Sequence, residues 1–366
     1  MTPDPGLASW LQLTLTPGLG AATIRGLLSQ FGLPENVLAT RRAELARFAS
    51  AEALQALDSG AVAKSVELAL AWLDQPGNAV VTLADAAYPR LLLEIADPPA
   101  LLYCRGRIDL LNRPVLAVVG SRNATAQGAS NAEQFARSFS AAGLTIVSGL
   151  AQGIDAAAHR GGLAAEGSTI AVLGTGVDTA YPRSNAALAD DIAARGLLTS
   201  EYALGTQAFA HNFPRRNRLI SGLAQGCLVV EAALGSGSLI TARSAAEQGR
   251  EVFAVPGSIH SPLSKGCHAL IKSGAKLAES AEDVLSELAA FRRTGFASTR
   301  SPAGASATTR GSDDPLLACM GFDPVDVDSL CARAGLPAER VSAELLRLEL
   351  AGRVAVLPGG LYQRLN

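Results

Sequence analysis

Short apolar runs alternate with alanine-rich stretches from about residue 80 to residue 292. The runs are rich in β-branched residues and have the length of strands: Val115–Val119, Leu144–Val147, Thr169–Leu173, Leu197–Thr199, Leu228–Val230 and Val252–Val255. The stretches between them have the length of helices, at about 129–142, 153–165, 184–195 and 238–249. Strands and helices in alternation are typical of a parallel sheet covered by helices on both faces. The pattern therefore predicts an α/β fold with a mostly parallel sheet for residues 80–292.

Residues 1–75 have a helical pattern instead. Apolar residues such as Ile24, Leu27 and Phe31 recur at helical spacing after a glycine-rich turn, Pro17–Gly20. Short helices joined by such a turn are typical of SAM-like or helix-hairpin-helix modules. The hairpin could offer backbone N–H groups to a phosphate. Small helical bundles more often pack against partners, and we favour that interpretation.

The C-terminal part begins after a segment with few apolar residues. Residues 293–314 are rich in Gly, Ser, Thr and Arg, which predicts a flexible linker. Beyond it, residues 315–366 combine two helical segments with a short hairpin, an order typical of a winged-helix-like unit. The second helical segment carries Glu339, Glu344 and Glu349 beside its arginines, and glutamates repel phosphates. We therefore favour a protein-contact or structural role for this unit over DNA reading.

The composition fits a compact globular protein with more than one domain: 366 residues, 48% hydrophobic and 17% charged, with 36 glycines. No apolar run is long enough to span a bilayer and no signal peptide is recognisable, which predicts a cytoplasmic protein. The five cysteines form no C-x-x-C pair and the four histidines have no metal-binding spacing, so we expect reduced thiols, no metal and no cofactor. Because the formal net charge is −2, any nucleic-acid site must be a local patch.

Glycine-rich turns follow several predicted strands at their carboxyl ends, where ligands bind in sheets of this kind. Gly120-Ser-Arg122 follows the first of the parallel strands, and Ser148-Gly-Leu-Ala-Gln-Gly153 follows the second. Gly174-Thr-Gly176 and Tyr181-Pro-Arg183 come after the third, and Gly235-Ser-Gly-Ser238 opens a later helix. Glycines expose backbone N–H groups, and arginine side chains are suited to phosphate. Together these turns predict a sheet edge that binds a polyanion.

The segment Phe213-Pro-Arg-Arg-Asn-Arg-Leu-Ile-Ser-Gly-Leu223 places three arginines within four positions, beside an aromatic residue. Arginines are costly to bury unpaired next to a sheet, so an anion is their expected partner. A basic surface with an aromatic platform is typical of proteins that bind single-stranded nucleic acids. An amphipathic surface helix with solvated arginines would have the same residues, and this segment alone does not separate the two interpretations.

These segments together resemble the DNA-processing protein A family, called DprA or Smf. The resemblance rests on ordered motifs: Val119-Gly-Ser-Arg122, Ser148-Gly-Leu-Ala-Gln-Gly-Ile-Asp-Ala-Ala-Ala-His159, Leu173-Gly-Thr-Gly-Val-Asp178 with Tyr181-Pro182, Phe213-Pro-x-Arg-Asn-Arg218, Ser236-Gly-Ser-Leu-Ile-Thr-Ala242 and Val255-Pro-Gly257. It covers about residues 80–290 and is weaker toward both ends. His268 departs from the family pattern, which usually has asparagine there, and this puts the local role of position 268 in doubt.

The resemblance implies an extended Rossmann-like domain that binds single-stranded DNA, with an N-terminal SAM-like module and a C-terminal winged-helix-like module. It implies a non-enzymatic homodimer that protects incoming DNA and loads the RecA recombinase in natural transformation and homologous recombination. Single-stranded DNA-binding protein is a further candidate partner, and no membrane contact is expected. The apolar pair Leu270-Ile271 either forms the dimer interface or packs on the sheet. The predicted DNA-binding residues are Gly120, Ser121, Arg122, Ser148, Gly149, Gln152, Gly153, Arg183, Phe213, Arg215, Arg216, Asn217, Arg218, Gly237, Ser238 and Thr241.

The alternative is a nucleotide-binding or nucleotide-hydrolysing Rossmann-like enzyme. The dinucleotide motif is incomplete at Gly174-Thr-Gly176, and the chain has no G-x-x-x-x-G-K-S/T motif. Related phosphoribohydrolases use a Pro-Gly-Gly-x-Gly-Thr-x-x-Glu motif, but here Ser244 stands three positions after Thr241, where acid–base catalysis needs the glutamate. Glu231 and Asp155 remain as candidate carboxylates, although such groups more often cap helices or pair with arginines. We therefore favour the binding protein.

Overall fold

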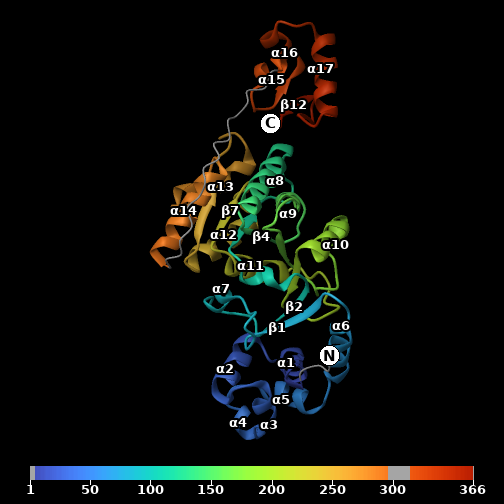
Figure 1. Ribbon diagram of the computed structural model, residues 1–366, viewed down its shortest axis with the longest axis vertical. Coiled ribbons are helices and arrows are strands. Elements are labelled where there is room, and N and C mark those ends of the chain that lie inside the picture. Colours follow the sequence, from blue (N-terminus) through green and yellow to red (C-terminus); the bar gives the residue numbers. More distant parts are fainter. Residues whose placement is uncertain (1–4, 296–313, 366) are drawn as a thin grey trace. The chain divides into compact units, whose positions relative to one another are not determined.

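The computed structural model describes residues 5–295 and 314–365, and the chain divides into two compact units (Figure 1). The larger unit comprises residues 1–123 and 132–288, and the smaller one comprises residues 124–131 and 289–366. Each unit has a buried hydrophobic core of its own. Among the described residues, no helix has the length and apolar character needed to cross a membrane.

The larger unit is built on a nine-stranded sheet with the strand order β1-β2-β6-β5-β4-β3-β7-β8-β9. The strands are β1 (Asn78–Thr82), β2 (Leu101–Gly106), β3 (Val115–Val119), β4 (Thr145–Ser148), β5 (Thr169–Val172), β6 (Leu197–Ser200), β7 (Gly226–Val229), β8 (Glu251–Ala254) and β9 (Lys276–Leu277). All neighbours from β6 to β9 are parallel, whereas β1 and β2 add an antiparallel edge. The predicted mostly parallel α/β sheet is confirmed, and the antiparallel edge adds to it.

The strand order contains a switch point at β3. The chain runs from β3 outward through β4, β5 and β6, and then returns to β7 on the other side of β3. In open α/β sheets, ligands bind beyond the carboxyl ends of the strands where the winding direction reverses. The fold therefore directs attention to the turns after β3, β4 and β7.

Helices cover both faces of the sheet. They are α7 (Arg90–Leu93), α8 (Ala126–Ala141), α9 (Ile154–Leu163), α10 (Ala186–Arg195), α11 (Asn212–Leu223), α12 (Ser238–Glu247), α13 (Lys265–Lys272) and α14 (Ala281–Gly295), with short 3-10 helices η1 (Ile108–Asn112), η2 (Arg183–Asn185) and η3 (Pro262–Ser264). Ile170 and Val172 share a buried cluster with α11 and α12, whereas Ala171 between them shares another with α10. Since alternate residues of a strand face opposite sides, these helices lie on opposite faces.

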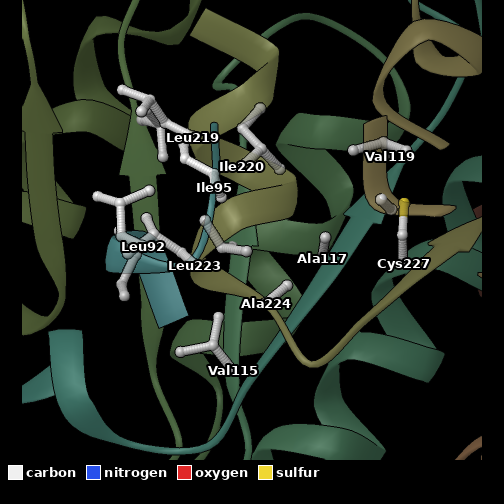
Figure 2. Packing of buried hydrophobic residues seen from close by; sticks show 14 of the residues in the cluster. Leu92, Ile95, Val115, Ala117, Val119, Leu219, Ile220, Leu223, Ala224 and Cys227 are labelled. Carbon is white, nitrogen blue, oxygen red and sulfur yellow. The ribbon is translucent and has the colours of Figure 1, made fainter. Parts of the chain in front are cut away.

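Helix α11 is anchored on the sheet by its apolar side. Figure 2 shows Leu219, Ile220 and Leu223 of α11 in one buried cluster with alternate residues of β3. These leucine and isoleucine side chains are at most 2% exposed, and burial of each contributes roughly 1.5–3 kcal/mol. Arg216 lies on this buried side near the amino end of the helix, whereas Arg215 and Arg218 are turned away from it, so the packing of α11 fixes where all three arginines point.

The N-terminal helices share a core with the sheet edge. They are α1 (Pro5–Leu15), α2 (Ala21–Phe31), α3 (Pro34–Ala39), α4 (Arg42–Leu45), α5 (Ala51–Asp58) and α6 (Ala63–Leu73). Trp10, Leu13 and Ile24 belong to the same buried cluster as Tyr103 of β2. In the turn between α1 and α2, Gly18 has a φ of +83°, which glycine adopts without strain. The predicted helical character of this region is confirmed.

The smaller unit is a winged helix, as predicted. It contains α15 (Pro315–Met320), β10 (Val325–Asp326), α16 (Val327–Ala334), α17 (Ala338–Leu350), β11 (Val354–Leu357) and β12 (Leu361–Arg364), with the sheet order β10-β12-β11. Asp326 begins α16 by accepting the Ser329 backbone N–H at 2.7 Å. The predicted linker at 293–314 lies mostly outside the described residues.

Candidate nucleic-acid interface

The glycine-rich turns after β3, β4 and β5 meet at one edge of the sheet because these strands are parallel neighbours. Ser121 donates its backbone N–H to the Glu231 carbonyl at 2.7 Å, which joins the turn after β3 to the end of β7. Gly153 has a φ of +73°, and a Cβ there would lie 2.3 Å from the Ser121 carbonyl oxygen. Glycine at this position therefore lets the turn before α9 lie against the turn after β3.

The three clustered arginines lie on one helix and point in different directions. They belong to α11, in which successive residues are rotated by about 100°. Arg215 is exposed, Arg216 is 3% exposed, and the Arg218 side chain is 16% exposed. Residues that are close in sequence thus have three different environments.

Arg216 points into the sheet edge. Its Nη1 donates to the Gly149 carbonyl at 2.8 Å and to the Val172 carbonyl, so it connects the ends of β4 and β5. Asp155 Oδ2 lies beside it and accepts the backbone N–H groups of Gly149 at 3.1 Å and Ala151 at 3.3 Å. Burial lowers the pKa of Arg216 to about 10, and the Asp155 carboxylate opposes that shift. Arg216 is therefore cationic at neutral pH, in a position where it forms the floor of a site.

An aromatic platform lies above this floor. The rings of Tyr181 and Phe213 are 5.3 Å apart between centroids with an interplanar angle of 38°, and Tyr181 is 46% exposed. The Arg122 guanidinium carbon lies 5.8 Å from the centroid of the Phe213 ring. A Cβ at Gly174 would lie 2.8 Å from Phe213 Cδ1, so the glycine leaves room for the ring. The result is an apolar surface with a cation at its side, which suits a stacked base and its phosphate.

Two cavities lie at the arginine floor, both lined by Phe213 and only the smaller one also by Tyr181. The larger, of about 460 Å³, is lined by Val119, Gly120, Ser121, Arg122, Asn123, Ala151, Asp155, Phe213, Pro214, Arg216, Asn217, Ile220, Ala233, Gly235, Ser236, Gly237, Ser238, Ile240, Thr241 and Leu263. The smaller, of about 210 Å³, is lined by Arg122, Gly149, Ala151, Gln152, Tyr181, Pro182, Phe213 and Arg216. Arg122, Phe213 and Arg216 belong to both, so the cavities adjoin.

The amino end of α12 borders the larger cavity. Gly235, Ser236, Gly237 and Ser238 line it, and Ser236 Oγ lies 2.7 Å from Ser238 Oγ. The first N–H groups of a helix carry a partial positive charge and attract anions. Together with Arg122 and Arg216, this helix end makes the cavity suitable for a phosphate.

The structure brings most of the predicted site residues together at these cavities. Gly120, Ser121, Arg122, Gly149, Gln152, Phe213, Arg216, Asn217, Gly237, Ser238 and Thr241 line one or both. Ser148, Gly153, Arg183, Arg215 and Arg218 line neither. Ser148 is fully buried and donates to the Val118 carbonyl at 2.7 Å, so it supports the turn from below.

Arg218 faces the N-terminal helices. Its Nη2 pairs with Glu201, and its Nε lies 3.6 Å from Asp97 Oδ2. Arg25 of α2 binds the other oxygen of the same carboxylate, Asp97 Oδ1, at 2.6 Å. Burial raises the pKa of Glu201, and the Arg218 charge opposes this shift. We therefore propose a structural role for Arg218, between the sheet and α2, in place of the predicted DNA contact.

Sequence reasoning missed two contributors to the site. Tyr181 was noted beside Arg183 and within a family motif but was not predicted as a site residue, yet its exposed ring completes the aromatic platform. Ser236 was noted within a turn, and its hydroxyl faces Ser238 at the amino end of α12. An aromatic residue directly after a glycine-rich strand end was the available signal for Tyr181.

Of the two carboxylates considered for catalysis, Asp155 has structural partners. Asp155 is 8% exposed, accepts two backbone N–H groups and lies beside Arg216. Glu231 is half-buried, and its carbonyl accepts the Ser121 N–H. Within the described ranges, no group of three or more His, Cys, Asp and Glu side chains could hold a metal ion.

Helix α13 carries the two remaining positions of interest. His268 Nε2 lies 3.0 Å from the Gly257 carbonyl oxygen, so the histidine contacts the Val255-Pro-Gly257 motif. Leu270 and Ile271 are half-buried and pack against the central core, and Leu270 also lines a groove of about 350 Å³. The pair therefore packs on the core and keeps a partly exposed surface.

His159 lies fully buried below the turn after β4. Because this histidine is protonated more readily in the unfolded chain than in the folded one, lowering the pH is expected to destabilise the larger unit. His159 Nε2 accepts the Leu150 N–H at 3.2 Å, which leaves the proton on Nδ1, 2.7 Å from Thr169 Oγ1. Burial and the charge of Arg216 lower its pKa from 6.5 to about 3. Between these values the unfolded chain binds a proton that the folded chain does not, so stability falls as the pH falls. The expected loss at pH 5 is about 2 kcal/mol.

Thermal unfolding of the parent and His159→Gln at pH 7 and pH 5 measures this effect. The loss on acidification should be smaller in the variant, which has no imidazole to protonate. Equal losses in both proteins would show that His159 does not cause the pH dependence.

Comparison with known proteins identifies relatives along most of the chain. Residues 79–289 match the family described as DNA recombination-mediator protein A, and residues 300–360 match the DprA winged helix domain. Protein Smf of Escherichia coli is 44% identical over 312 residues, which cover 83% of this chain and 82% of that protein. DNA processing protein DprA of Streptococcus pneumoniae is 51% identical over 206 residues, covering 56% of this chain and 73% of that protein.

Two solved structures share the fold. The X-ray structure of DNA processing protein A from Streptococcus pneumoniae has a TM-score of 0.67 and 40% identity, covering 78% of this chain and 99% of that chain. DNA processing protein A from Helicobacter pylori, whose structure gives insights into its single-stranded DNA binding mode, has a TM-score of 0.53 and 30% identity, covering 58% of this chain and 96% of that chain. The family match spans more than half of this chain in one stretch. The chain therefore belongs to the DprA/Smf family of DNA recombination mediators.

Proposed function

We propose that this protein binds single-stranded DNA at the carboxyl edge of its sheet and delivers it to the RecA recombinase. The observation that carries the proposal is the Tyr181–Phe213 platform with Arg122 beside it and Arg216 below it. Single-stranded DNA presents flat bases and a charged backbone, and this site offers a surface for each. The single-stranded DNA binding of the Helicobacter pylori relative supports the same assignment.

In this proposal the base and the phosphate of a nucleotide bind at different parts of the two cavities. A base stacks on Phe213 or Tyr181, and its phosphate lies near Arg122 and the amino end of α12. Stacking is tolerant of sequence because every base has a flat face, so little sequence preference is expected. Duplex DNA keeps its bases paired and stacked inside, and therefore offers nothing to the platform.

We propose that the protein is not an enzyme. Ser244 replaces the glutamate that phosphoribohydrolases use, and Asp155 is occupied by two backbone N–H groups. Incubation with nucleoside monophosphates should therefore release no free base. Release of base that is abolished in Glu231→Gln would instead support the nucleotide-hydrolysing alternative.

We propose a cytoplasmic homodimer whose partners are RecA and, as a second candidate, single-stranded DNA-binding protein. The half-buried pair Leu270-Ile271 on α13 is one surface that could form the dimer. Protection of incoming DNA during natural transformation follows from binding that covers the bases. The winged helix carries exposed Leu346 and Leu350 beside its glutamates, which suits protein contact better than a DNA groove.

Replacement of Arg122 by alanine is expected to weaken single-stranded DNA binding and its dependence on salt. Loss of one phosphate contact should reduce the slope of log affinity against log salt by about 0.7 for a single strand. Fluorescence anisotropy with labelled single- and double-stranded DNA of equal length, at several salt concentrations, measures both effects. Arg195→Ala is the matched control, because Arg195 ends α10 at the opposite edge of the sheet. Equal affinities of the two variants would contradict the proposed site.

A further inference from the structure

A second aromatic pair lies on the surface near the amino end of α11. Phe209 is 52% exposed, and its ring stacks on His211 with centroids 5.8 Å apart and an interplanar angle of 14°. An exposed phenylalanine alone is common on protein surfaces. Here, however, two flat rings are aligned and remain accessible, because His211 is exposed as well. We call this pair the Phe209–His211 platform.

The loop that carries this platform is held in place by hydrogen bonds. The Gly176 N–H donates to the Thr206 carbonyl at 2.9 Å, and the Gly205 N–H donates to the Asp178 carboxylate at 2.9 Å. The Asn212 N–H donates to the Phe209 carbonyl at 3.0 Å, which connects the loop to the start of α11. The platform is therefore pre-organised, so that a ligand would not have to order it.

Arg215 supplies a cation on the same side of α11. His211 and Arg215 are four residues apart, which places them on one helix face. Arg215 is exposed, and in the part of the chain that the structure describes it makes no hydrogen bond or ion pair, although the Glu201 carboxylate is close enough to interact with it. An accessible arginine beside stacked rings has the same combination of features as the main site.

A cavity of about 290 Å³ lies next to Arg215, between the sheet and the N-terminal helices. Its lining includes Tyr202 and Ala203 from the end of β6, and Leu19, Gly20 and Ile24 from the turn before α2 and its first residues. The cavity is distinct from the two at the main site, since it shares no lining residue with either of them. It offers mixed apolar and polar walls with Arg215 at one position, and the Glu201 carboxylate in its lining is paired with Arg218.

Phe213 of the main site and Arg215 lie on different sides of α11. They are two residues apart on this helix, which turns their side chains to nearly opposite sides. A helix with its side chains is about 10–12 Å across. A DNA strand that leaves Phe213 therefore has to cross only the amino end of α11 to reach Arg215.

We propose that the Phe209–His211 platform, Arg215 and the adjoining cavity form a second single-stranded DNA subsite, which continues the strand's path from the main site to the N-terminal helices. This proposal rests on the proposed DNA-binding function. The subsite takes one or two further nucleotides: a base stacks on Phe209 or His211, and a phosphate binds Arg215. The N-terminal helices then form one wall of the DNA path as well as packing on the sheet.

Oligonucleotide length separates the second subsite from the main one. We would measure fluorescence anisotropy with labelled dT2, which is too short to reach both sites, and dT20 for the full chain, for Phe209→Ala/Arg215→Ala and for Phe213→Ala. The matched control is Leu68→Ala/Arg195→Ala, which also removes an exposed apolar residue and an arginine, on α6 and α10. Melting temperatures confirm that each variant is folded.

The proposal predicts that Phe209→Ala/Arg215→Ala weakens dT20 binding by about 5- to 150-fold and leaves dT2 binding, which the main site alone can hold, nearly unchanged. Unchanged dT20 binding, or equal losses on both lengths, would overturn the second subsite. Loss of dT2 binding in Phe213→Ala tests the main site separately. If Phe213→Ala bound dT2 like the parent protein, the proposed function would be wrong at its main site, whatever the double variant did.

Discussion

Phe213→Ala is expected to weaken single-stranded DNA binding by about 5- to 150-fold, because a base loses the ring on which it stacks. Phe213 is half-buried, lines both cavities and lies next to Tyr181 and Arg122. Its removal therefore affects the stacking surface and the position of the arginine together. Anisotropy with a labelled oligonucleotide measures the change.

Phe213→Tyr is the control for this prediction. It keeps a flat ring of nearly the same size, so the affinity should stay within a few-fold of the parent value. If Phe213→Tyr lost as much affinity as Phe213→Ala, stacking would not be the cause. A parent-like affinity of Phe213→Ala would remove the platform from the DNA site altogether.

Arg216→Met is expected to destabilise the larger unit by about 3–5 kcal/mol, the usual cost of leaving a buried charge uncompensated. The substitution keeps an unbranched side chain but removes the donor to the Gly149 and Val172 carbonyls. It also leaves the Asp155 carboxylate buried without its cation. Urea unfolding followed by tryptophan fluorescence reports on this unit, because the only two tryptophans, Trp10 and Trp72, lie in it.

A second substitution tests the cause of that loss. Asp155→Asn in the Arg216→Met background removes the unpaired charge, while the amide oxygen can still accept the Gly149 and Ala151 N–H groups. Part of the lost stability should therefore return. A further loss in the double variant would show that the charge of Asp155 is not what makes Arg216→Met costly.

The central sheet could be predicted from the sequence because its strands are short, apolar and separated by helices of regular length. The runs at 115–119, 169–173 and 252–255 correspond to β3, β5 and β8 with only small shifts at their ends. The antiparallel edge formed by β1 and β2 was harder to predict from the sequence. Strand β1 begins with half-buried residues, and its pairing with β2 depends on contacts that no local pattern contains.

The arginine-rich segment shows what a linear motif leaves out. Its composition indicated an anion site, but the sequence did not show that α11 begins at Asn212 and turns Arg215, Arg216 and Arg218 in separate directions. The apolar side of α11 decides this, because it packs on β3 and fixes the rotation of the helix (Figure 2). Arg218 then meets Glu201, a residue that follows β6 and has no sequence signal linking it to the segment.

The same reasoning explains why the glycines were informative. Gly149 and Gly174 follow neighbouring strands, and each lies directly against a side chain of α11, namely Arg216 and Phe213. The sequence predicted flexible phosphate-binding turns at these positions. The structure adds a second reason for the glycines, which is close approach of the helix that carries the site.

Photocrosslinking tests most directly whether bases stack on the aromatic platform. Oligothymidylates with single 5-iododeoxyuridine substitutions would be bound to the full chain, irradiated, and the crosslinked peptides identified by mass spectrometry. The proposed function predicts adducts at Phe213 or Tyr181, which are lost when excess unlabelled single-stranded DNA competes. Adducts confined to other exposed aromatic residues, such as Phe322 of the winged helix, would contradict a DNA site at the carboxyl edge of the sheet.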